Sequence, residues 1–255
     1  MPSDDSSPQS GSESTRFQKL FDPSAEQLIQ LVAGRTVAAI VHAWHEGREA
    51  QIVITGGRTG LAIAKGIDVA LFRTTSQDET FKGAKVRIWL SDERFLGLDD
   101  PERSDSTLMA GFERSTSHIL FERVAEPSTC TLAEAAEKYA SELDIKVGDT
   151  SRFDAVILSM GEDGHIASLF PGHTRELDSM KSAVAVDNSP KPPAERVSIG
   201  VARLANASAI YIFVVGEGKR EALEELLGGG QTSPISLFRE SSPNASISIV
   251  TDLKF

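Results

Sequence analysis

A histidine that follows two carboxylates between glycines is the strongest sign of chemistry in this sequence. The segment reads Ser159-Met-Gly-Glu-Asp-Gly-His165. Histidine titrates near neutral pH, so His165 is a natural general base, and Asp163 or Glu162 could orient its ring. The alternative is a structural histidine in a capped loop, which the flanking glycines make less probable without excluding it.

The same segment does not favour a metal centre. His165 and His173 are eight residues apart, which does not place two ligands on one face of a helix. The chain has a single cysteine, Cys130, so a zinc site built from cysteines and an intrachain disulfide are both excluded. We therefore expect catalysis without a metal and without a cofactor.

A second charged segment reads Ser91-Asp-Glu-Arg-Phe95. A carboxylate such as Asp92 could act as an acid or base or accept a hydrogen bond from a substrate hydroxyl, and Arg94 could bind a phosphate with two parallel hydrogen bonds. The alternative is a solvated turn with a local ion pair, which is the commoner fate of such a run.

Two glycine-containing segments could bind a phosphate. The first, Thr55-Gly-Gly-Arg-Thr-Gly60, makes Gly56, Gly57, Arg58 and Thr59 candidate contacts. It is neither a Walker A loop nor a dinucleotide-binding fingerprint, and an ordinary strand-to-helix turn is the alternative. The second, Gly216-Glu-Gly-Lys219, puts a lysine at the start of an expected helix, where a bound anion would relieve its conflict with the helix dipole. A solvent-facing lysine is the alternative there.

Each of these four segments follows a short apolar run rich in β-branched or aromatic residues, which is typical of a buried parallel strand. The four runs cover residues 51–55, 86–90, 153–158 and 210–215. Shorter candidate strands lie at 119–124, 183–187, 196–199 and 246–251. Ligands collect beyond the carboxyl ends of such strands, so the four polar segments are expected to meet there.

Helical patterns fill the intervals between the runs. Residues 37, 40, 41 and 44 are apolar at helical spacing, and Asp22-Pro23 predicts the start of that helix, with Asp22 as the cap. A Thr-x-x-Glu capping box predicts a helix that begins at Thr131, and a further helix is expected over 218–227. Strands that alternate with helices predict an α/β fold: a mostly parallel, Rossmann-like sheet flanked by helices.

The composition limits the possible partners. The 255 residues are 40% hydrophobic and 25% charged, with a net charge of −11, which argues against a nucleic-acid or anionic-membrane binder. No apolar run is long enough to span a bilayer and no secretory signal is visible, so a cytoplasmic protein is expected. Residues 1–15 are serine-rich and predict a disordered tail, with a single domain over 16–255 and an oligomeric state left open.

Together the segments resemble the 6-phosphogluconolactonase family, within the wider group that includes the glucosamine-6-phosphate deaminases. The likeness covers nearly the whole chain outside the tail. It is carried by 55–60, 89–95, 160–172, 196–199 and 216–219, in the order of the family. The deaminases typically have Asp-Glu-Tyr where this chain has Asp92-Glu93-Arg94, which favours the lactonases. Two positions depart from the family pattern: Arg58 replaces a small residue, and Ser104 or Thr107 stands where lactonases usually have an asparagine.

The resemblance implies hydrolysis of 6-phospho-D-glucono-1,5-lactone in the oxidative pentose phosphate pathway. His165 would take a proton from water and return one to the leaving ring oxygen, oriented by Asp163 or Glu162. Arg94 and Lys219, with the 56–59 loop, would hold the phosphate.

Further roles follow from the same resemblance. Asp92 would contact sugar hydroxyls or the water, Arg196 is a further candidate for binding, and backbone N–H groups near Gly56-Gly57 or Gly161 would hold the oxyanion. The partner would be a small phosphorylated sugar lactone. Two other functions remain open at this point: deaminase-like chemistry on an amino sugar phosphate, and a sensor that binds a sugar phosphate without converting it.

Overall fold

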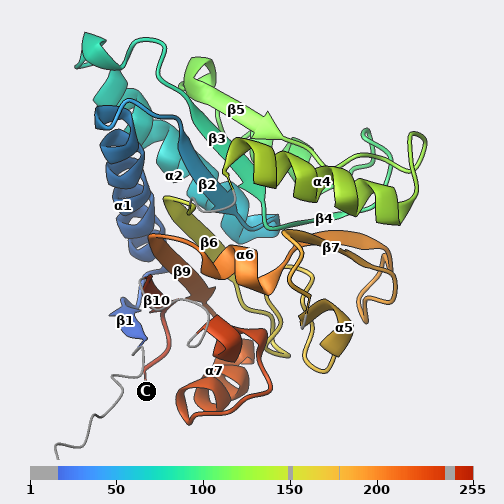
Figure 1. Ribbon diagram of the computed structural model, residues 1–255. Coiled ribbons are helices and arrows are strands. Elements are labelled where there is room, and N and C mark those ends of the chain that lie inside the picture. Colours follow the sequence, from blue (N-terminus) through green and yellow to red (C-terminus); the bar gives the residue numbers. More distant parts are fainter. Residues whose placement is uncertain (1–16, 149–151, 178, 239–244, 255) are drawn as a thin grey trace, which may run out of the picture.

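The computed structural model describes residues 17–148, 152–177, 179–238 and 245–254 (Figure 1). The predicted tail over residues 1–15 lies outside the described residues. Seven parallel strands form the central sheet in the order β1-β10-β9-β6-β2-β3-β5. Their bounds are β1 (Gln18–Phe21), β2 (Ala50–Ile54), β3 (Val86–Leu90), β5 (Ile119–Glu122), β6 (Ala155–Ser159), β9 (Ala209–Val214) and β10 (Ser246–Thr251).

The predicted α/β fold with a mostly parallel sheet is therefore confirmed. All four long apolar runs are central strands, because a strand that is covered on both faces needs apolar side chains throughout. The edge strand β1 was missed. Its four residues are mostly exposed and carry no apolar run, so the sequence pattern gives no sign of it.

Helices cover both faces of the sheet, as Figure 1 shows. Helices α1 (Ala25–His45) and α2 (Gly57–Thr75) pack with Ile52 and Ile54 on one face. Val53, whose side chain points the opposite way, belongs to the core on the other face. That core includes residues of α4 (Leu132–Lys146), α6 (Val201–Ala205) and α7 (Arg220–Leu227). The remaining short helices are α3 (Ser104–Met109), α5 (Thr174–Leu177), η1 (Glu79–Phe81), η2 (Thr116–His118), η3 (Glu217–Lys219) and η4 (Pro234–Leu237).

The helix starts were predicted with mixed success. The capping box of α4 is confirmed: the Thr131 hydroxyl accepts a hydrogen bond from the Glu134 N–H, and the Glu134 carboxylate accepts one from the Thr131 N–H. The prediction of Asp22 as the cap of α1 was wrong. Ser24 is the cap and accepts from the Gln27 N–H, while the Asp22 carboxylate accepts from the Ser24 N–H and fixes the turn before the helix.

A second, antiparallel sheet lies beside the carboxyl edge of the central one. It pairs β4 (Asp92–Arg94) with β8 (Arg196–Ile199), and β8 with β7 (Ala183–Val186). The sequence analysis identified 91–95 as a charged segment and did not predict a strand there. Because these residues form a strand, Glu93 is buried while Asp92 and Arg94 on either side of it stay partly exposed.

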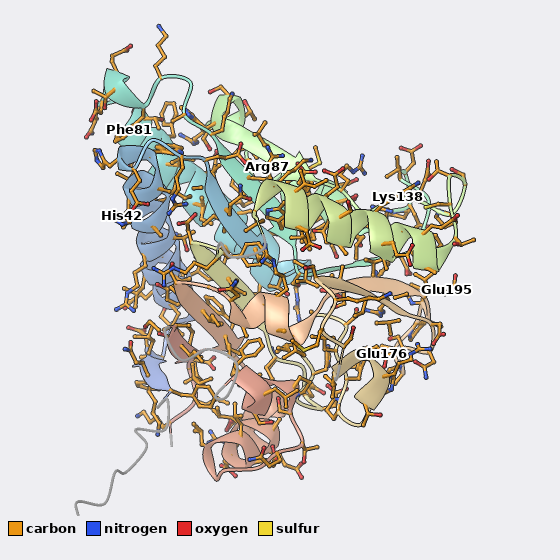
Figure 2. All side chains as sticks on the ribbon, in the orientation of Figure 1. His42, Phe81, Arg87, Lys138, Glu176 and Glu195 are labelled. Carbon is orange, nitrogen blue, oxygen red and sulfur yellow. The ribbon has the colours of Figure 1, made fainter. Side chains whose placement is uncertain are left out.

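Three histidines that could have been site candidates lie at the other edge of the sheet, where β2 and β3 begin. His45 contacts the ring of Phe81, and His118 contacts Trp44 and the carbonyl oxygen of Ala84. Figure 2 labels His42 and Phe81 at this end of the molecule. These histidines serve packing and the surface, and they lie away from the carboxyl edge where the charged segments meet.

Candidate active site

A cavity of about 540 Å³ opens at the carboxyl edge of the central sheet. Its walls come from the start of α2, from β4, from the segment before α3, from the loop after β6, from η3 and from the loop before β8. Most of the predicted site residues line it together with some that were not predicted. The lining includes Gly56, Gly57, Asp92, Arg94, Ser104, His165, Lys191, Arg196 and Lys219. The expectation that the four polar segments converge is therefore met.

The loop after β6 holds the imidazole of His165 against its own backbone. The Gly161 N–H donates to the carbonyl oxygen of His165 at 2.8 Å. A Cβ atom at position 161 would lie 2.1 Å from the His165 ring, so only glycine fits there. The Gly161 N–H is thus already bonded within the loop, which leaves the backbone N–H groups near Gly56-Gly57 as the other predicted candidates for holding an oxyanion.

Two neighbours fix the orientation of the His165 ring. Nδ1 makes a hydrogen bond with Oδ1 of Asp163, and the ring stacks on Phe170 with centroids 4.9 Å apart. Of the two carboxylates weighed from the sequence, Asp163 is therefore the partner. A proton on Nδ1 leaves Nε2 as the basic nitrogen.

Burial lowers the pKa of His165, and this effect outweighs the hydrogen bond and charge of Asp163, which raise it. For Asp163, burial acts to raise the pKa, but the hydrogen bond from His165 and the charges of His165 and Lys191 outweigh it and lower the pKa. At neutral pH the pair is therefore a neutral imidazole beside an ionised carboxylate, which is the state that a general base needs.

Lys191 is a site residue that the sequence analysis did not propose. Its Nζ lies 3.3 Å from Nδ1 of His165 and 3.5 Å from Oδ1 of Asp163. The positive charge of Lys191 lowers the pKa of both neighbours. A cation within the proline-rich stretch Ser189-Pro-Lys-Pro-Pro193 was the available signal, but neither periodicity nor a motif ties that loop to His165.

Asp92 and Glu93 are neighbours in β4 with different surroundings. Asp92 lines the cavity, where its two carboxylate oxygens accept from the hydroxyls of Ser91 and Ser168 at 2.9 and 2.6 Å. The Glu93 side chain is fully buried and accepts backbone N–H bonds from Ser104 and Asp105, so it caps α3. Burial raises the pKa of Glu93 to about 7. Both residues border the cavity, but only the Asp92 side chain is partly exposed, and it is the one placed to meet a ligand.

Three of the four predicted cations, Arg94, Arg196 and Lys219, line the cavity, but they differ in what already binds them. Arg94 donates to the carbonyl oxygen of Glu102 at 2.7 Å, and Nζ of Lys219 donates to the Ser159 hydroxyl at 3.1 Å. Burial lowers the pKa of Lys219. Arg196 donates to the carbonyl oxygens of residues 191–193, so it also holds the loop that carries Lys191.

The glycine loop after β2 is divided between two cavities. Gly56 and Gly57 line the main cavity at the start of α2, where a Cβ atom on Gly56 would lie 2.4 Å from the Ser104 hydroxyl oxygen. Arg58 and Thr59 were predicted to join them, but they line a neighbouring cavity of about 530 Å³. The reason is that α2 already begins at Gly57, so its first turn directs the next residues away from Gly56.

Neither a metal centre nor a membrane helix is found within the described ranges. No group of three or more His, Cys, Asp or Glu side chains there could hold a metal ion. No helix in the same ranges is long and apolar enough to cross a bilayer.

A family model described as glucosamine-6-phosphate isomerases/6-phosphogluconolactonase matches residues 23–247. The chain belongs to this family. A curated relative named 6-phosphogluconolactonase, from Mycobacterium tuberculosis, is 29% identical over 231 residues, covering 84% of this chain and 87% of the relative. A second relative of that name, from Streptomyces coelicolor, is 29% identical over 214 residues, covering 80% of each.

Solved structures of the family share the fold. A 6-phosphogluconolactonase from Trypanosoma cruzi superposes with a TM-score of 0.78 at 18% identity, covering 93% of this chain and 95% of that one. A second structure of that name, from Shewanella baltica, gives a TM-score of 0.72 at 23% identity, covering 94% and 97%. At these identities the structural likeness supports the fold, and the reaction has to be argued from the site.

Proposed function

We propose that this chain hydrolyses 6-phospho-D-glucono-1,5-lactone to 6-phosphogluconate, as a step of the oxidative pentose phosphate pathway. The observation that carries the proposal is the imidazole of His165, which is oriented by Asp163 and lines one cavity with Arg94 and Lys219. The family and the names of the curated relatives support the same reaction. A lactone is an activated cyclic ester, so a positioned base and acid are sufficient for its hydrolysis.

His165 supplies both functions in the proposed mechanism. Nε2 removes a proton from water while the water oxygen attacks the carbonyl carbon of the lactone. The tetrahedral intermediate then breaks the bond between that carbon and the ring oxygen, and His165 returns the proton to this oxygen. The ionised Asp163 holds the Nδ1–H and stabilises the imidazolium ion while it exists.

The cations of the cavity have a binding function in the proposal. The whole chain carries a charge of −11, so attraction of a phosphorylated substrate depends on a local reversal of charge. Arg94 and Lys219, with the N–H groups at the start of α2, hold the phosphate. Asp92 accepts from a sugar hydroxyl, and Arg196 contributes by holding the loop that carries Lys191.

The test is lactone turnover by the wild type beside two variants, corrected for spontaneous ring opening. We expect His165→Ala to lower kcat by about 1,000-fold, and Arg94→Ala to raise KM with a smaller effect on kcat. His42→Ala is the matched control, because His42 lies on α1 at the opposite edge of the sheet and its side chain is 73% exposed. If both variants showed the same fall in kcat and the same rise in KM, the division of roles between His165 and Arg94 would be contradicted.

The same assays separate the other two functions. Ammonia release from glucosamine 6-phosphate would favour the deaminase reaction. A thermal shift with 6-phosphogluconate in a protein that does not open the lactone would favour a sensor.

We also propose that residues 16–255 form one domain and act in the cytoplasm. The two cores share strands, since Ile157 of β6 belongs to one and Val156 to the other. A phosphorylated lactone carries charges that hinder its passage through a bilayer, so enzyme and substrate belong in one compartment. A single cooperative unfolding transition tests the first statement, and cell fractionation tests the second.

A further inference from the structure

A tight turn directly after the loop that carries His165 brings a buried hydroxyl, that of Ser168, to Asp92 in the cavity wall. Ile166 and Leu169 exchange both backbone hydrogen bonds, so Ala167 and Ser168 form the tip of a two-residue turn. Ala167 has a φ of 49°, and it is the only non-glycine residue with positive φ within the described ranges. Left-handed backbone at an alanine costs free energy and persists where the surrounding structure requires it.

Ser168 uses this turn to connect three segments of the site. Its hydroxyl donates to Oδ2 of Asp92 at 2.6 Å, and its backbone N–H donates to the hydroxyl oxygen of Ser198 at 3.3 Å. Ser168 is 1% exposed, so its side chain is shielded from solvent. The loop after β6, strand β4 and strand β8 thus meet at one side chain.

The bond from Ser168 completes the restraint on the Asp92 carboxylate. The Ser91 hydroxyl donates to Oδ1, so each oxygen of Asp92 has one fixed donor and the carboxylate cannot turn about its own axis. Ser168 lies three residues after His165 on the same loop. One short segment therefore carries the base and also binds the Asp92 carboxylate, and His165 and Asp92 line the same cavity.

We propose that Ser168 is a positioning residue: it holds the Asp92 carboxylate in the orientation that accepts the substrate hydroxyl while His165 activates water. This inference rests on the proposed lactonase function. It assigns no covalent role to Ser168, whose hydroxyl is buried against a carboxylate and has no hydrogen bond to a histidine among the described residues.

A double-mutant cycle distinguishes this role from a purely structural one. Ser168→Ala, Asp92→Asn and the double variant are compared with the wild type in kcat/KM for the lactone. A hydrogen bond to a charged group predicts a loss of about ten-fold for Ser168→Ala in the wild-type background. If Ser168 acts only through Asp92, the same change in the Asp92→Asn background costs less than about two-fold.

Ser115 offers a matched control. Its hydroxyl donates to a carboxylate oxygen of Asp68 at 2.6 Å, both residues are buried, and neither lines the cavity. Ser115→Ala removes the same kind of bond elsewhere, so it should lower the melting temperature and leave kcat/KM within about two-fold. If Ser168→Ala does not fold, Ser168→Cys replaces it, because a thiol of similar size donates only weakly.

The outcomes are separable. Losses that multiply in the double variant, or an unchanged kcat/KM in Ser168→Ala, would overturn the positioning role while the turnover of the wild type still supports the proposed function. A wild type that does not open the lactone would overturn the proposed function, and this inference with it.

Discussion

Two regions at the carboxyl edge of the sheet use the same residue types in opposite ways. The corner from β4 to α3 holds Glu93, Arg103 and Asp105, whose side chains are fully buried. The loop after β6 holds Asp163 with a 41% exposed side chain, beside Lys191 with 46%. Both regions follow a buried parallel strand, and in the sequence both contain charged residues that could be catalytic or bind a ligand.

The difference lies in what the charged groups bind. In the corner, Arg103 donates to Asp105 at 2.7 Å, and Glu93 accepts the backbone N–H groups that begin α3, so donors and acceptors satisfy one another. In the loop, Asp163 binds only one of the two nitrogens of His165, and the ring lies in the wall of an open cavity. Charged groups that are buried and have all their hydrogen bonds satisfied stabilise the backbone, whereas charged groups that keep an unbonded atom at a cavity can react.

The largest effect that we expect is a loss of stability when the buried corner is disrupted. Glu93→Ala leaves the first N–H groups of α3 without an acceptor, and it leaves an empty space beside Arg103 where the Glu93 side chain was. We expect the free energy of unfolding to fall by about 3 kcal/mol, measured by urea denaturation at about pH 6. A loss below about 1 kcal/mol would mean that the corner is not a structural network.

The converse substitution is Asp163→Asn in the loop. It removes the charge that stabilises the imidazolium form of His165 and weakens the preference for a proton on Nδ1. We expect kcat to fall about 100-fold, while the free energy of unfolding changes by less than about 1 kcal/mol. Steady-state kinetics and urea denaturation on the same preparation measure both. A pattern like that of Glu93→Ala would remove the distinction between the two regions.

The sequence was sufficient for what depends on long-range averages. Apolar runs predicted the central strands, and the principle that ligands collect at the carboxyl ends of parallel strands predicted which segments meet. His165, Asp92, Arg94 and Lys219 were found in this way, and all four line one cavity. Glycine at 161 was noted as part of a bracket, but its contact with the imidazole needed coordinates.

The sequence was insufficient where the direction of a single side chain decides whether it reaches the site. The three adjacent charges at 92–94 gave no sign that they form a strand, so the inward turn of Glu93 was missed. Arg58 was placed with Gly57 as a possible phosphate contact of the same loop, yet the two consecutive residues of α2 line different, neighbouring cavities. Lys191 was missed because its partners lie more than twenty residues away in the chain, where no local pattern can register them.

The dependence of stability on pH sharpens the account of the corner. Burial raises the pKa of Glu93 from 4.5 to about 7, so its favourable contribution is complete below about 4.5 and is lost as the pH rises through about 7. Glu93→Gln has no proton to lose. Between about pH 5 and pH 8, the difference in unfolding free energy should therefore shift in favour of the variant by about 2 kcal/mol. Urea denaturation across this range measures the shift, and a constant difference would show that the Glu93 carboxylate is ionised throughout.

The smallest expected effect tests the loop. The positive charge of Lys191 disfavours protonation of His165 and lowers its pKa, so Lys191→Met should raise that pKa. Activity requires the neutral ring, and the acid limb of kcat/KM should accordingly move to higher pH. Lys181 provides the control, because Lys181→Met removes one surface charge outside the cavity and should leave the limb in place. A limb that moves to lower pH would mean that Lys191 acts mainly by holding the Asp163 carboxylate against His165, and that the open loop, like the buried corner, is governed by pairing within the protein.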